Sequence, residues 1–113
     1  MKKLTDDLRN RIYKLCGSHI MTELERTIRE FNMNTEAANQ AANRMEKGRV
    51  SNMPKDLFFI IQLQGHAWAA IAQVYNENLL KLIRDVKISD EAFAQELMAH
   101  IYGDIEAPKE VLR

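Results

Sequence analysis

The feature that most constrains this chain is the stretch from Leu57 to Tyr75, the most apolar part of the sequence. It is about as long as a membrane span, but three glutamines, a glycine and a histidine interrupt it, whereas a span needs ~20 predominantly apolar residues. We therefore interpret it as part of a long helix at about 54–86. The first half of that helix is apolar almost all round, so it must be covered on several sides.

Apolar residues recur at helical spacing in the rest of the chain as well. Steps of four, four and three residues predict two helices, at about 3–16 and 18–31, that are either separate or fused into one. A stripe of alanines and a methionine predicts a third helix at about 35–47. A last helix is expected to begin after Ser89 as its N-cap and to end at Gly103.

These patterns predict an all-α fold for one domain, residues 1–113: a compact bundle of about five helices around the long helix. Four glycines and two prolines are too few turn residues for a sandwich or a barrel. The single cysteine, Cys16, excludes an internal disulfide and suits a reducing compartment. Because no apolar segment follows the N-terminal lysines, we expect a soluble, cytoplasmic protein. Residues 104–113 are expected to form a short tail.

The sequence contains no motif for catalysis or for a cofactor: a nucleophile elbow, a Walker-type loop and a dinucleotide fingerprint are all missing. Cys16 and His19 have the spacing of half a zinc site, but no second pair of ligands follows. His66, beside Trp68 on the long helix, is interpreted as a core histidine. We therefore expect a non-enzymatic protein without catalytic residues, metal site or cofactor.

The clearest functional pattern is a candidate helix-turn-helix at about 22–47, with Asn32-Met33-Asn34 as its turn and 35–47 as the recognition helix. Asn and Gln side chains pair with adenine in the major groove. The candidates for reading bases are Glu36, Asn39, Gln40 and Asn43. The candidates for contacting phosphates are Arg26, Arg29, Arg44, Lys47 and Arg49. The pattern departs from a regular motif because the turn has Asn where Gly is usual.

The zero net charge conceals an uneven distribution. Residues 1–55 hold eleven Lys and Arg against seven Asp and Glu, whereas residues 56–113 hold five against nine. A basic first half favours contact with nucleic acid. The leading hypothesis is therefore a transcription regulator that binds DNA through residues 22–49 and dimerises through the long helix.

The predicted homodimer follows from the excess of apolar surface on the long helix, since exposed apolar patches of that size mark interfaces. Its dimer or core residues are predicted to be Leu57, Phe58, Ile61, Trp68 and Ile71. The alternative hypothesis is a protein-binding adaptor or inhibitor, for example an anti-defence factor of a phage or mobile element. Six methionines favour this alternative slightly, because methionine suits adaptable contact surfaces. Neither hypothesis involves a membrane.

Overall fold

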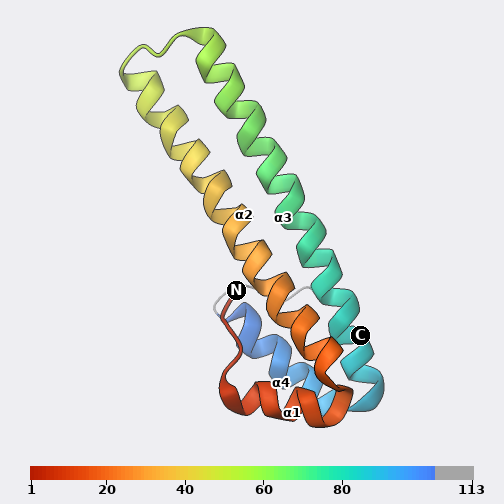
Figure 1. Cartoon of the computed structure of the whole chain (residues 1–113). Helices are drawn as coiled ribbons and strands as arrows, with labels where there is room; N and C mark the ends of the chain where they lie inside the picture. The colour runs from red at the N-terminus through yellow and green to blue at the C-terminus, as the bar shows by residue number, and fades with distance from the viewer. Residues whose placement is uncertain (104–113) are drawn as a thin grey trace.

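A computed structural model describes residues 1–103, which form four helices and no strand (Figure 1). Helix α1 spans Asp6–Cys16, α2 spans Ser18–Val50, α3 spans Lys55–Ser89 and α4 spans Glu91–Tyr102. The all-α prediction is confirmed, with four helices in place of about five. The predicted tail at 104–113 lies outside the described residues.

The helix ends follow from local capping. The Thr5 side chain accepts a hydrogen bond from the Leu8 amide at the start of α1, and the Asp90 side chain accepts one from the Phe93 amide at the start of α4. Asp90, and not the predicted Ser89, is therefore the N-cap of the last helix. Gly17, with φ at 89°, separates α1 from α2, because a left-handed backbone conformation favours glycine.

The predicted turn at 32–34 is wrong, because α2 continues through it without a break. The two asparagines that indicated a turn bond elsewhere. The Asn34 amide donates to the Glu30 carbonyl one turn back in the same helix, at 2.8 Å. The Asn32 side chain accepts from the Met1 amino group and donates to the Met1 carbonyl, both at 2.8 Å. Residues 22–47 therefore form one helix, and they do not form a helix-turn-helix.

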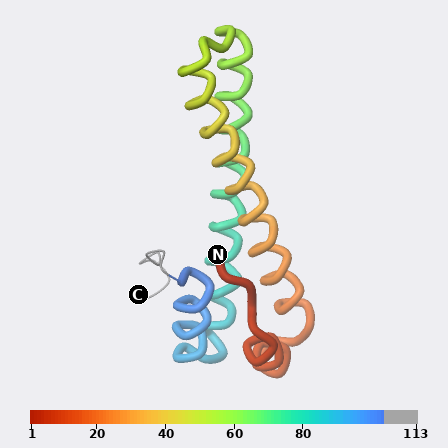
Figure 2. Tube along the Cα trace, turned by 90° about the vertical axis from the view of Figure 1, so that its left-hand side faces the viewer, coloured from red at the N-terminus to blue at the C-terminus, as the bar shows by residue number. Residues whose placement is uncertain are grey.

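The molecule is a long helical hairpin standing on a small base (Figure 1, Figure 2). Helices α2 and α3 run antiparallel, and α1 and α4 lie against their lower ends. We call α1, α4 and these lower ends the base, and the remaining hairpin, residues 33–74, the stem. The molecule measures 55 × 26 × 19 Å, and its radius of gyration of 17.3 Å exceeds the ~13 Å of a globular domain of this size. The predicted helical bundle is confirmed, but it is elongated and not compact as expected.

The hydrophobic core lies in the base. All four helices contribute to it, with Ile12 from α1, Leu24 from α2, Ile83 from α3 and Leu97 from α4 all fully buried. The predicted helix at 54–86 is confirmed as α3, but the four shorter helices do not wrap it. In the stem, α2 is the only described element against α3, so most of the circumference of α3 is exposed among residues 1–103.

Candidate interaction surface

The part of α3 that solvent reaches along the stem is a continuous apolar surface. Its large members expose between 43% and 62% of their area to solvent. We call this surface the outer face of α3, and it consists of Leu57, Phe59, Ile60, Leu63, Ala67, Ala70, Ile71 and Val74. Between Asp56 and Glu77 the helix has no charged residue. Nothing in the described chain covers this surface.

Helix α3 is long and apolar enough to cross a membrane, by length and composition alone. Only 11% of its most apolar window is buried within the structure. The core helix of a globular domain meets the same length and composition test but is mostly buried. The low burial of α3 therefore separates it from such a helix.

The residues predicted for dimerisation divide between the two sides of α3. Leu57 and Ile71 are exposed on the outer face, whereas Ile61 is 1% exposed and packs toward α2. Phe58 and Trp68 are half-buried, and the Arg49 guanidinium lies 5.7 Å from the centre of the Phe58 ring. Ile61 is thus a core residue of the hairpin and is not available for dimerisation.

Four large residues of the outer face were not predicted: Phe59, Ile60, Leu63 and Val74. A signal for five of the eight residues of this surface was present in the spacing of Ile60, Leu63, Ala67, Ala70 and Val74. They alternate steps of three and four, which is the seven-residue repeat of helices that pair lengthwise.

Small residues hold the two helices of the stem together. Ala41 of α2 is 2% exposed and faces Gly65 of α3. Beside this contact a shallow groove runs between the helices, lined on the α2 side by Ala38 and Ala42 and on the α3 side by Ala69. His66, expected in the core, is exposed at the edge of this groove. These small residues let α2 and α3 approach closely at this point.

The predicted base-reading residues lie together on α2. Glu36, Asn39, Gln40 and Asn43 are all exposed, and their spacing places them on one face of the continuous helix, opposite the buried Ala41. This face does not belong to a recognition helix, since the turn that would define one is missing. We call it the outer face of α2.

The predicted phosphate contacts are scattered. Arg26 donates to the Glu23 carboxylate at 2.9 Å, and this pairing raises the pKa of Arg26 and lowers that of Glu23. Arg49 lies over Phe58 near the tip. Arg29, Arg44 and Lys47 are exposed along α2. The structure therefore brings only Arg44 and Lys47 close to the outer face of α2 at 36–43.

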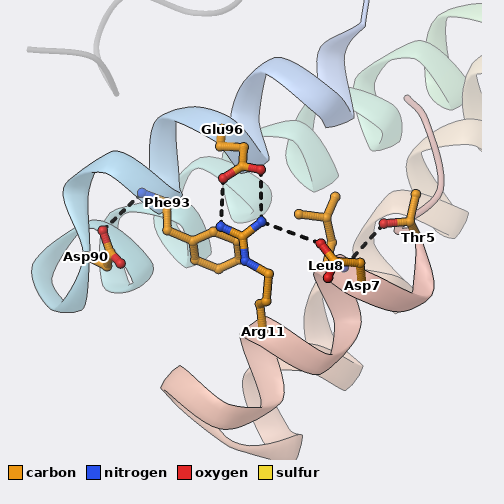
Figure 3. Close-up of polar contacts among 7 residues, drawn as sticks. All are labelled: Thr5, Asp7, Leu8, Arg11, Asp90, Phe93 and Glu96. Carbon is orange, nitrogen blue, oxygen red and sulfur yellow. Dashed lines mark hydrogen bonds and ion pairs between the residues drawn. The ribbon is translucent and has the colours of Figure 1, made fainter.

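The base is held by a charged contact between α1 and α4 (Figure 3). The Arg11 guanidinium donates to both carboxylate oxygens of Glu96, at 2.9 and 2.7 Å, and lies 4.5 Å from the centre of the Phe93 ring. Asp7 approaches the same guanidinium at 3.5 Å. Arg11 thus contacts Glu96, Phe93 and Asp7 of the same chain. We therefore interpret Arg11 as a residue that stabilises the base.

The residues suited to catalysis do not converge. Burial raises the pKa of the half-buried Cys16 thiol, which disfavours the nucleophilic thiolate. A ring nitrogen of His100 lies 2.8 Å from the Lys3 carbonyl oxygen. Within residues 1–103 no group of three His, Cys, Asp or Glu side chains is placed to hold a metal ion.

No protein-family model, no curated protein and no solved structure matches this chain.

Proposed function

We propose that this chain is a non-enzymatic regulatory protein that acts by binding another protein chain through the outer face of α3. The observation that carries the proposal is the uncharged apolar surface between Asp56 and Glu77, which residues 1–103 leave exposed. The largest apolar patch on a soluble monomer is typically ~300–600 Å² and often functional. The six large residues of the outer face alone leave on the order of 600 Å² accessible, at the top of that range.

The partner surface that fits is the apolar stripe of an α-helix. The outer face is convex and narrow, because it follows one side of a single helix. Two such stripes approach to ~8–10 Å between helix axes when their side chains interdigitate. The seven-residue repeat of the outer face favours this lengthwise packing over a crossed contact.

The arrangement of α2 favours a protein partner over a lipid bilayer. Helix α2 lies along the whole stem, and its exposed side carries Glu36, Arg44 and Glu46. If α3 crossed a membrane while paired with α2, these charges would enter the hydrocarbon region, where charged side chains are costly. A protein partner covers the outer face of α3 and leaves the charges of α2 in water.

Site-specific crosslinking in cells tests the proposal. A photo-crosslinking amino acid replaces Leu63 on the outer face of α3, and the matched control carries it at Gln40 on the outer face of α2. We expect Leu63, and not Gln40, to crosslink to a helical segment of a protein, which peptide mapping identifies. Crosslinks from Leu63 to lipid, or protein crosslinks from Gln40 alone, would contradict the proposal.

A second candidate function is DNA contact through the outer face of α2. It is favoured by the exposure of Asn39, Gln40 and Asn43 on one side of an uninterrupted helix, with Arg44 and Lys47 close by. A helix with its side chains, ~10–12 Å across, fits a major groove ~12 Å wide. In this case the chain is a DNA-binding regulator whose second copy, joined through α3, supplies the other half of the site.

A fluorescence anisotropy titration at two salt concentrations tests DNA contact, with DNA from the locus of the gene as the probe. We expect Arg44→Ala to weaken binding to every sequence and to flatten the salt dependence. Asn39→Ala should chiefly relax the sequence preference, because it removes a base contact. Thermal melting of each variant controls for unfolding. If the unaltered protein binds no DNA at low salt, this second candidate is rejected.

A further inference from the structure

A stripe along α3 combines five residues of the outer face with charged residues at both ends, and its composition is complementary to itself. Its members are Asp56, Ile60, Leu63, Ala67, Ala70, Val74, Glu77 and Lys81, at alternating steps of four and three. All eight are exposed in the structure. The stripe begins with an acid, has two alanines at its centre and ends with a base. From either end of the stripe, charged residues come first, large apolar residues follow, and the small alanines lie at the centre.

We infer that a second copy of this chain covers the outer face, with the two α3 helices packed antiparallel about a two-fold axis between Ala67 and Ala70. This inference rests on the proposed function and names the partner of the same surface. In this register Ala67 faces Ala70 of the other copy, so the helices approach closely at the centre. Leu63 then meets Val74 on either side of the axis, and Ile60 meets the aliphatic part of Glu77.

Charge selects the antiparallel arrangement. When the helices run in opposite directions, Asp56 of each copy lies opposite Lys81 of the other, and the dimer gains two pairs of opposite charge at its ends. When they run in the same direction, Asp56 faces Asp56 and Lys81 faces Lys81. Like charges that lie opposite one another repel, so they disfavour the parallel dimer.

The available area is close to what a stable dimer needs. The five large residues on or beside the stripe supply on the order of 500 Å² per copy, and the alanines and charged ends add to it. They are Phe59, Ile60, Leu63, Ile71 and Val74. A stable interface buries ~800 Å² per partner. A two-fold dimer also uses the same patch on both copies, as closed assemblies of identical chains do. The paired stems then form a four-helix arrangement with α3 at its centre.

Light scattering and sedimentation of the full chain at micromolar concentrations test the dimer. We expect twice the 13.1 kDa mass of one chain. Leu63→Arg should raise the dimer dissociation constant at least tenfold, because it places a charge in the apolar centre. The matched control Gln40→Arg puts the same charge on the outer face of α2 and should leave the constant unchanged. A folded, unaltered protein that remains a monomer overturns the inference.

A charge exchange tests the direction of the helices. Asp56→Lys and Lys81→Asp should each weaken the dimer, and the double variant should restore it, because opposite charges again face each other. The double variant restores nothing in a parallel dimer. In a Cys16→Ser background, Leu63→Cys should form disulfides with Val74→Cys of a mixed partner more readily than with itself. Preferred pairing of Leu63→Cys with itself would overturn the antiparallel register.

The outcomes separate this inference from the proposed function. If the purified chain is a monomer while Leu63 crosslinks in cells to a different protein, the proposed function holds and the second copy is rejected. If the chain is a dimer that Leu63→Arg leaves intact, the dimer forms elsewhere and the inference fails. If Leu63 crosslinks to no protein, both are rejected.

Discussion

Ala41 of α2 and Gly65 of α3 meet in the middle of the stem so closely that a Cβ atom added to Gly65 would lie 3.1 Å from that of Ala41. This contact explains how a hairpin only two helices thick holds together far from the core. Small facing residues let the helix backbones approach, so many weak van der Waals contacts form along the seam. It also fixes which side of α3 faces inward, and therefore which side remains for a partner.

The contact predicts that enlarging Ala41 destabilises the hairpin. In Ala41→Leu the added carbons meet the backbone of α3 at Gly65, and overpacking of this kind typically costs ~1–3 kcal/mol. Gln40→Leu introduces the same side chain at the neighbouring exposed position and should change stability by less than ~0.5 kcal/mol. Urea unfolding followed by circular dichroism measures both variants. Equal effects at the two positions would contradict the close packing of Ala41.

The long helix could be predicted from the sequence because its apolar periodicity is uninterrupted, and α3 confirms it. The continuity of α2 could not be predicted, because Asn32 and Asn34 are residues typical of turns. Their side chains bond the Met1 backbone and the Glu30 carbonyl, and sequence alone does not reveal such partners. Local propensity therefore favoured a turn at a place where contacts within the fold stabilise a helix.

A proline in the middle of α2 tests whether this helix is continuous through residues 32–34. Met33 is 58% exposed, so replacing its side chain alone disturbs little. In a continuous helix, Met33→Pro removes a backbone hydrogen bond and clashes with the preceding turn, at a cost of ~3 kcal/mol or more. Met33→Ala keeps the backbone intact and should be nearly neutral. Thermal melting of both variants measures the two effects. A mild effect of the proline would show that residues 32–34 form a turn after all.

The excess of apolar surface on the long helix was also visible in the sequence, but its direction was not. Predicting the inward side requires knowing that Ala41 packs against Gly65, since this contact sets the rotation of α3. Ile61 and Ile60 are adjacent and chemically identical, yet only Ile61 faces α2. The sequence therefore predicts the excess of apolar surface more reliably than it predicts which residues remain exposed.

The pairing of Arg11 with Glu96 predicts an acid-sensitive contact between α1 and α4. The hydrogen bonds from Arg11 lower the pKa of Glu96 in the folded protein. The contact therefore contributes stability above the ordinary glutamate pKa of ~4.3, and loses it as pH falls through the lower folded value. Glu96→Gln should be less stable than the unaltered protein at neutral pH, with the difference shrinking in acid. Urea unfolding at a series of pH values measures it, and a pH-independent difference would contradict this role.

The N-cap of α4 predicts a second contribution to the stability of the base. Asp90 accepts a hydrogen bond from the Phe93 amide at 3.0 Å, so Asp90→Ala leaves that amide without its cap and should cost ~1 kcal/mol. Asp90→Asn keeps an acceptor oxygen at the same place and should retain most of the stability. Unfolding curves of the two variants give the comparison. An asparagine variant as unstable as the alanine variant would show that charge, and not the cap, matters at this position.

The burial of Tyr102 predicts that its hydroxyl loses its proton only at high pH. Its hydroxyl donates to the Asn76 side-chain oxygen at 2.6 Å, and burial raises the pKa of Tyr102 to about 12. Because an unfolded tyrosine has a pKa of ~10, the unfolded state releases this proton first, and the native state loses stability as pH rises from ~10 toward ~12. Absorbance titration of the folded chain should show a step near 12 that is missing in Tyr102→Phe. If Tyr102→Phe leaves the last step unchanged, the hydroxyl is not buried as the structure places it.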